Sequence, residues 1–340
     1  MSTAPIQGTG SFPPVGTVTL LVLAGLGLFL SDWAAFVFTV ALAKSLIVLG
    51  IILMMRAGLV SFGQGLYVAA SAYAAAFASR LWGVTDAFVL LLVGAAVSAV
   101  LAALVGPVVS RYREIFFAML TMAVSMVLYG FLLKAYSITG GTDGIGMREP
   151  TLLGAVVTGV AARRAYYYLS LFLAAVAVYG AHRLDHSPLG YMVKSIRDND
   201  IRLEYLGVSV RQVIFAAYVL AAVLAGCGGV LLAFALGHIT PELANWTSSG
   251  EFVFIALFAG SGSVFAPVLG SIAYQFLQTY AAKYWPYTWH IAMGAAMLLI
   301  ILFMPEGLWG IVKRITAWRS RKEAMVVASG APTDGRVGDA

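Results

Sequence analysis

Residues 34–55 read AAFVFTVALAKSLIVLGIILMM, an apolar run with one charged side chain, Lys44. A helix of this length can cross the roughly 30 Å hydrocarbon core of a bilayer. The rest of the chain has the same character, because 61% of its 340 residues are hydrophobic and 11% are charged. Soluble domains carry about 25% charged residues, so the composition indicates an integral membrane protein.

Nine further apolar runs are bounded by charges or turn residues in the same way. With 34–55 they predict an all-α protein of about ten transmembrane helices, the others at 14–31, 59–79, 87–109, 115–136, 165–182, 212–236, 251–264, 267–283 and 288–304. We therefore expect a transmembrane domain over 14–310. It lies between a short N-terminus (1–13) and a basic tail (311–340) whose last part has the composition of a disordered segment.

Basic residues indicate the orientation of this domain. With ten spans, the loop 183–211, the tail after the last span and the links at Arg56 and Arg111 all fall on one side of the membrane. Lys and Arg accumulate in cytoplasmic loops, so we assign that side to the cytoplasm and place both termini inside. The loop 137–164 then faces outward, and the net charge of +6 reflects topology rather than nucleic-acid binding.

The long cytoplasmic segment 187–207 has the pattern of two short helices. Ser187 and Pro188 suit the start of the first helix, Asn199 with its acidic neighbours suits a second start, and Gly207 suits the end. Two interpretations remain open, a docking element for a soluble partner and a helix lying in the headgroup region. The residues assigned to docking are Ser187, Pro188, Gly190, Ile196, Arg197, Asp198, Asn199, Arg202, Leu203 and Gly207.

The start of the third span, AGLVSFGQG at 57–65, combines glycines with polar side chains. Helix N-termini and unwound backbone commonly hold polar solutes inside membranes, so Ser61, Gly63, Gln64 and Gly65 are candidates for a translocation pathway. Tight helix packing through small residues explains the glycines equally well, but it explains Gln64 less well.

Two further features are candidates for the same pathway. Gly260 and Gly262 lie in a turn between two short spans, and such a turn is tolerated at membrane depth only where protein or a cavity satisfies its backbone. Lys44 at a bilayer centre costs roughly 2.5–3.5 kcal/mol, so it needs a partner, or it snorkels because the span boundaries differ. Glu251 is expected at a helix N-terminus.

The outward loop contains Gly140, Gly141, Asp143 and Gly144, which predict a compact turn. It lacks the Gly-Lys-Ser/Thr ending of a phosphate loop, so nucleotide binding is not supported. The loop is either an external docking or gating element or a plain surface loop. The four histidines are scattered and Cys227 is the one cysteine, so no metal site, cofactor or catalytic centre is predicted.

Six ordered motifs resemble the LivM-type permease family of the ATP-binding-cassette importers for branched-chain amino acids. They are AGLVSFGQG (57–65), TGGTDG (139–144), SPLG (187–190) with IRDND (196–200) and LGV (206–208), AGCGG (225–229), the glycine turn from 260 to 267, and PEGL (305–308). The resemblance covers about residues 34–310. It departs from the family pattern at Ile52, Met55, Gln64 and Tyr191, where Asn, Gly, His and Arg are usual.

The resemblance implies a vitamin B12-importer-like (type II) permease with short or broken helices, in a bacterial inner membrane. It also implies a second homologous permease, two ATPase subunits that hydrolyse ATP, and an extracytoplasmic solute-binding protein. The segment 187–207 would then contact an ATPase. We expect branched-chain or other amino acids as solutes, with urea or amides as an alternative within the family. A free-standing channel or secondary transporter is the alternative from another class.

Overall fold

The computed structural model describes residues 14–152, 154, 159–303 and 307–310. Predictions for residues 1–13 and 311–340 lie outside these ranges. The helices in the described part are α1 (Pro14–Leu26), α2 (Asp32–Arg56), α3 (Gln64–Leu81), α4 (Ala87–Val109), α5 (Glu114–Lys134), α6 (Tyr136–Thr139), α7 (Val160–Asp185), α8 (Pro188–Tyr205), α9 (Val210–Leu236), α10 (Trp246–Ala259), α11 (Ala266–Tyr284) and α12 (Trp289–Phe303).

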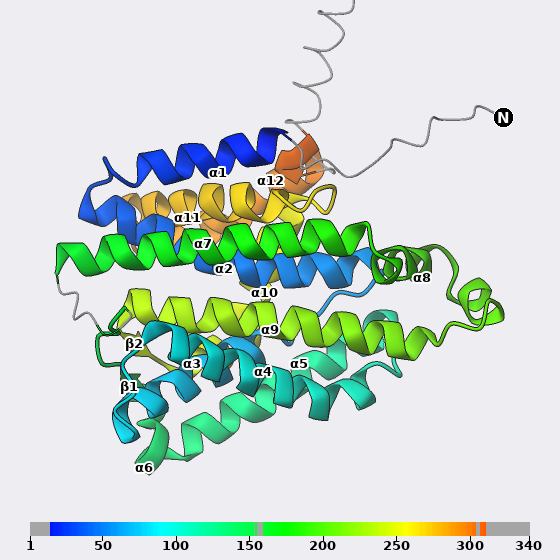
Figure 1. Ribbon diagram of the computed structural model, residues 1–340, viewed down its shortest axis with the longest axis horizontal. Helices are drawn as coiled ribbons and strands as arrows, with labels where there is room; N and C mark the ends of the chain where they lie inside the picture. The colour runs from blue at the N-terminus through cyan, green and yellow to red at the C-terminus, as the bar shows by residue number, and fades with distance from the viewer. Residues whose placement is uncertain (1–13, 153, 155–158, 304–306, 311–340) are drawn as a thin grey trace, which may run out of the picture.

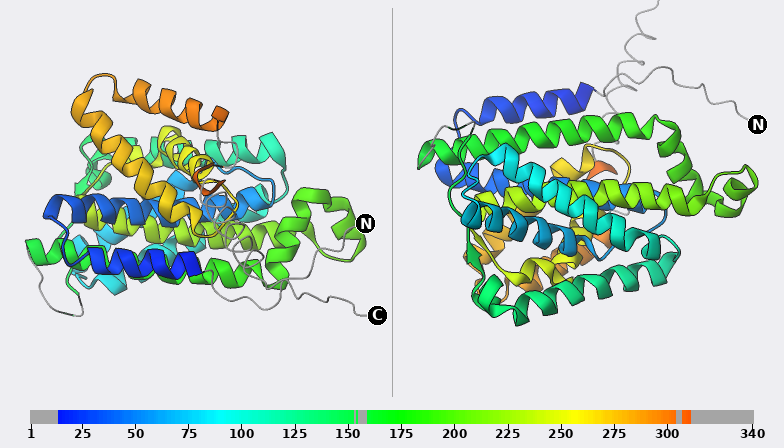
Figure 2. Two further views of the ribbon diagram at one scale, coloured as in Figure 1. Left: turned by 90° about the horizontal axis from the view of Figure 1, so that it is seen from above. Right: turned by 60° about the horizontal axis from the view of Figure 1, so that its bottom comes forward.

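The long helices lie side by side and define two ends of the molecule. Figure 1 shows α2, α7 and α9 running along one direction, with α8 projecting beyond them at one end. At the other end β1 (Ile145–Gly146) pairs antiparallel with β2 (His238–Ile239). Short 3₁₀ helices, η1 (Gly141–Asp143) and η2 (Pro241–Ala244), adjoin these strands in sequence. Figure 2 shows α12 at the margin of the bundle, beside α11.

Each of the ten predicted spans falls on a helix, and the boundaries of 87–109 are reproduced by α4. Five helices, namely α2, α4, α5, α7 and α9, are long and apolar enough to cross a membrane. The described chain is therefore an all-α, multi-pass membrane protein. The count of ten crossings stays a prediction, because α1, α3, α10, α11 and α12 are shorter or less apolar.

Helix α9 approaches three other helices at backbone distance through the AGCGG motif. A Cβ at Gly228 would lie 2.7 Å from the Ala43 carbonyl oxygen on α2, and one at Gly229 would lie 2.4 Å from the Val68 carbonyl oxygen on α3. A Cβ at Gly226 would lie 2.1 Å from a serine hydroxyl on α4. Small residues permit such close packing where lipid offers no hydrophobic driving force between helices. The glycines therefore hold α2, α3 and α4 around α9.

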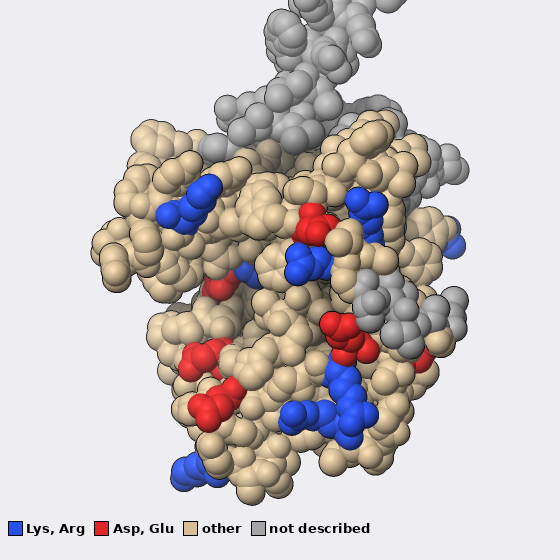
Figure 3. Space-filling model, turned by 90° about the vertical axis from the view of Figure 1, so that its left-hand side faces the viewer, with Lys and Arg blue, Asp and Glu red and all other residues tan. Residues whose placement is uncertain are grey.

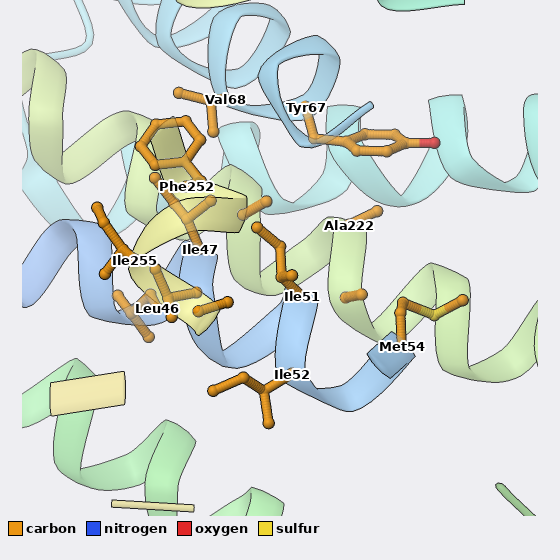
Figure 4. Packing of buried hydrophobic residues seen from close by; sticks show 14 of the residues in the cluster. Leu46, Ile47, Ile51, Ile52, Met54, Tyr67, Val68, Ala222, Phe252 and Ile255 are labelled. Atoms are coloured by element: carbon orange, nitrogen blue, oxygen red, sulfur yellow. The ribbon is translucent and has the colours of Figure 1, made fainter. Parts of the chain in front are cut away.

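Burial separates the central helices from the peripheral ones. In the most apolar stretch of α2, 94% of the residues are buried inside the protein, against 28% in α4 and 22% in α5. Figure 4 shows how side chains from four helices fill the centre, with Ile47 of α2, Val68 of α3, Ala222 of α9 and Phe252 of α10 among them. The exposed apolar faces of α4 and α5 are those expected to meet lipid.

The predicted break between two short helices is present, and it lies at the α8 end of the molecule. Gly260, with φ of 86°, ends α10, and α11 begins at Ala266. Ser261 and Gly262 line the same surface pocket as Arg197 of α8. The turn is thus partly exposed beside α8 and is not buried halfway along the bundle.

The packing of α9 gives a first prediction. Gly229→Ala should lower the free energy of unfolding by about 1–3 kcal/mol, because the new methyl group overlaps the backbone of α3. The apparent Tm of the purified protein in detergent measures this change.

Gly130→Ala is the matched control, since Gly130 also lies inside a helix and a Cβ there meets nothing within 4 Å. Alanine is intrinsically better than glycine in a helix by about 1 kcal/mol, so this Tm should be unchanged or higher. Equal Tm values for the two variants would contradict the packing argument.

Candidate functional site

Lys44 lies at the middle of α2, twelve residues from Asp32 and from Arg56. Its Nζ donates to Glu251 Oε1 of α10 at 2.7 Å and to Gln278 Oε1 of α11 at 3.0 Å. The side chain of Lys44 is 10% exposed and that of Glu251 is 27% exposed. The lysine therefore finds protein partners, and snorkelling from a displaced span boundary is not needed to explain it.

An aromatic ring completes the surroundings of this ammonium group. Tyr274 of α11 places its ring centroid 5.5 Å from Lys44 Nζ. A cation over an aromatic face is stabilised by about 2 kcal/mol when it is desolvated. The carboxylate, the amide and the aromatic ring together stabilise the buried ammonium charge of Lys44.

The contact between Glu251 and Lys44 was not predicted, and the expected position of Glu251 at a helix N-terminus is wrong. The structure begins α10 at Trp246 with Asn245 as its cap, so Glu251 lies in the second turn and not at the N-terminus. A usable signal was present in the sequence. Glu251 and Gln278 are polar side chains within two predicted apolar spans, and an intramembrane charge needs a partner.

A cavity of about 500 Å³ adjoins the ion pair on the side away from α2. Glu251 lines it together with other residues of α10, and the remaining walls come from α11 and α12. Ligand pockets in proteins commonly enclose 300–1,000 Å³. The site thus combines a carboxylate with a space large enough for a small organic solute.

The Gly-Gln-Gly start of α3 is buried against neighbouring helices. Ser61 and Gln64 have no exposed surface, and the backbone N–H of Gly65 donates to Ser249 Oγ of α10 at 2.9 Å. Both polar atoms of the Gln64 amide lack a hydrogen-bond partner among the described residues. A buried polar group left unpaired costs about 1–3 kcal/mol, so this amide has free capacity to bind water or a polar solute.

Helix α10 connects two of the candidate pathway features. Ser249 contacts α3 at Gly65, and Glu251, two residues further on, contacts Lys44. Residues two apart on a helix point in different directions. Helix α10 therefore lies between the start of α3 and Lys44. Gly260 and Gly262 lie apart from both, beside α8. The pathway assignment of Lys44, Ser61, Gly63, Gln64, Gly65, Gly260 and Gly262 stays a prediction.

The segment 187–207 has the predicted local structure. Ser187 Oγ accepts from the Gly190 N–H, and Pro188 occupies the first turn of α8. Asn199 has an extended backbone, with φ of −169° and ψ of 104°, and its Oδ1 accepts from the Arg202 N–H. It therefore interrupts α8 and caps a second short helix, and Gly207 (φ 81°) follows the last turn.

Not all of the residues assigned to docking face outward. Gly190, Ile196 and Leu203 are buried, and a Cβ at Gly190 would overlap the Leu184 carbonyl oxygen at 2.1 Å. These three residues fix α8 against the bundle. Arg197, Asp198, Asn199 and Arg202 are exposed.

Exposed apolar side chains at the tip of α8 were not among the residues assigned to docking. Tyr205 is 88% exposed, Leu206 78% and Ile201 60%. A helical projection of the sequence places these residues away from the buried face that contains Leu203. That projection could have predicted their exposure.

Charged groups attach α8 to the ends of other helices. Asp185 of α7 pairs with Arg56 of α2, and Lys194 Nζ of α8 lies 3.6 Å from the same carboxylate oxygen. Arg113, before α5, lies 4.0 Å from Asp200 of α8. Arg56, Asp185 and Lys194 form one network, which stabilises the attachment more than the separate, partly exposed Arg113–Asp200 pair does.

The glycine loop at the opposite end is closely packed. Gly140, Gly141 and Gly144 all have positive φ, and the backbone carbonyl oxygen of Asp143 accepts a hydrogen bond from His238 Nε2 at 2.7 Å. A Cβ at Gly144 would lie 2.1 Å from the Ile239 carbonyl oxygen. The loop is thus held against β2, and charges of both signs are interspersed over this end of the molecule (Figure 3).

These features define a multi-pass helical protein with a buried ion pair and a projecting helical segment, the class to which membrane permeases belong. Residues 33–302 match the family described as the permease component of branched-chain amino acid transport systems, and the chain belongs to this family.

Two curated relatives have the same description. The chain is 26% identical over 272 residues to the high-affinity branched-chain amino acid transport system permease protein LivM of Escherichia coli (strain K12). It is 28% identical over 272 residues to the LivM protein of Salmonella typhimurium. Each match covers 74% of this chain and 64% of the relative, so the chain spans less than two thirds of either relative's length. No solved structure matches the chain.

The ion pair gives a second prediction. Lys44→Met should lower the free energy of unfolding by about 3 kcal/mol, because it leaves the Glu251 carboxylate without its counter-ion. This is the lower end of the range for breaking a buried pair, chosen because Glu251 keeps some exposure. Chemical or thermal unfolding in detergent measures the loss.

Combining Lys44→Met with Glu251→Gln removes both charges and should recover most of this stability. Lys134→Met, which removes an exposed lysine from α5, should stay within about 0.5 kcal/mol of the unmodified protein. A double variant no more stable than Lys44→Met would argue that the two charges do not depend on each other.

Proposed function

We propose that this chain is the permease subunit of an ATP-driven importer in a bacterial inner membrane. With a second, homologous permease it forms the path for a small polar solute, most often a branched-chain or other amino acid. Two ATPase subunits on the cytoplasmic side hydrolyse ATP, and an extracytoplasmic binding protein delivers the solute. The ten crossings and the type II arrangement of short helices belong to this proposal.

The surface of α8 is the observation that carries the proposal. A segment that projects beyond the bundle, is anchored by buried Gly190, Ile196 and Leu203, and presents Tyr205 and Leu206 to solvent is suited to a soluble partner. A helix lying in the headgroup region would turn its apolar face to lipid, whereas the main apolar face of α8 is buried against its own chain. We therefore place the ATPase contact on the exposed face of α8.

The solute class rests on the relatives and on the polar groups within the bundle. Both relatives are described as permeases for branched-chain amino acids. Of the positions that depart from the family pattern, Ile52 lies in an apolar pocket between α2, α7 and α9, apart from the cavity beside Glu251. Gln64 has an unpartnered amide. Urea or amide import within the same family remains the alternative for the solute.

Co-purification separates an importer subunit from a free-standing channel or secondary transporter. When the chain is co-expressed with the ATPase subunits of a branched-chain amino acid importer from the same cell, a tagged form should retain both ATPase subunits. Arg197→Glu with Arg202→Glu should reduce the retained ATPase at least tenfold, because both arginines lie exposed on α8.

Arg80→Glu with Arg164→Glu is the matched control. It reverses two exposed charges at the far ends of α3 and α7 and should leave the ATPase yield unchanged. Leu203→Asp is unsuitable as a probe, because Leu203 is buried and a carboxylate there would disturb the packing of α8 as well as any docking contact. Unchanged ATPase yield in the α8 variant would overturn the docking assignment, and no ATPase in any sample would favour a free-standing transporter.

A further inference from the structure

The cavity beside Glu251 is a half-open space between α10, α11 and α12, and most of its lining residues take no part in the contacts of Lys44 described above. Glu251 and Phe254 of α10, Tyr274 of α11, and Met293 and Met297 of α12 line it, together with other residues of α10 and α12. Among these described lining residues Glu251 is the one carboxylate, and none is Lys or Arg. The cavity is therefore acidic on one side and largely apolar on the other.

The Glu251 carboxylate contacts protein on one side and open space on the other. Its Oε1 accepts from Lys44 on the α2 side, and its side chain, 27% exposed, lines the cavity on the other. An ammonium group entering the cavity can therefore approach the same carboxylate that Lys44 contacts. Lys44 keeps Gln278 and the Tyr274 ring as neighbours during such an approach.

The apolar wall suits a flexible aliphatic side chain. Met293 and Met297 are one turn apart on α12, and methionine adapts its shape to irregular partners. Phe254 supplies an aromatic surface from α10. Near the start of the same helix, Thr247 also lines the cavity, where the positive end of the helix dipole favours a carboxylate.

We propose that this cavity is a transient subsite for an aliphatic amino acid. The solute's ammonium group contacts Glu251 in competition with Lys44, its side chain contacts Met293 and Met297, and its carboxylate faces the first turn of α10. The inference rests on the proposed importer function and deepens it, because it assigns the solute class to this chain as well as to a binding protein.

Cysteine protection tests the subsite in the complete importer. In a Cys227→Ala background, Met293→Cys reports on the cavity through its rate of reaction with N-ethylmaleimide, read as the intact mass of this chain. Saturating L-leucine should slow the reaction at least threefold. Isocaproate, which is leucine without its ammonium group, should not slow it, and Glu251→Gln should abolish the protection by leucine.

Leu299→Cys is the matched control, because Leu299 lies on α12 with 53% exposure and is not among the lining residues. Its reaction rate should not respond to leucine. Met297→Cys serves as the second reporter if Met293→Cys does not assemble. Absence of protection at either reporter, or equal protection by isocaproate, overturns the subsite.

Leucine uptake into proteoliposomes of the same preparations separates this inference from the proposed function. Protection is read without transport, so protection without uptake supports the subsite and counts against the importer. Uptake without protection supports the importer and overturns the subsite.

Discussion

The close approach of α9 to its neighbours is the constraint on which the rest of the structure depends. Three glycines within about one turn of α9 let α2, α3 and α4 pack closely on different sides of it. In lipid, such contact gains stability from dispersion and geometry rather than from excluding water. The position of α2 follows from this packing, and with it the depth of Lys44, since the lysine is one turn from Ile47, which faces Gly228.

A buried charge in this setting has a strong effect on its surroundings. Lys44 recruits Glu251 from α10 and Gln278 from α11, so two short helices are fixed to a long one by polar contacts. The same helix α10 supports the start of α3 through Ser249. The polar interior is therefore organised around α10, which has only fourteen residues and is one of the shorter apolar helices of the described chain.

Local features of this protein could be predicted from the sequence, because they depend on neighbouring residues. The apolar runs located the helices, and Ser187, Pro188, Asn199 and Gly207 marked the starts and ends within 187–207. The sequence marks Lys44, Glu251 and Gln278 as polar groups that need partners within apolar spans. It does not say which of them meet, because 207 positions separate Lys44 from Glu251. The depth of the turn after Gly260 could not be predicted either, because it depends on how α10 packs against the rest of the bundle.

The ion pair between Arg56 and Asp185 has a mechanical consequence. Arg56 is the last residue of α2, and α2 continues as one unbroken helix to Lys44, about 18 Å away at 1.5 Å per residue. Asp185 in turn contacts Lys194 of α8. A force applied to α8 would therefore act through Asp185 and Arg56 on the end of the helix that carries Lys44.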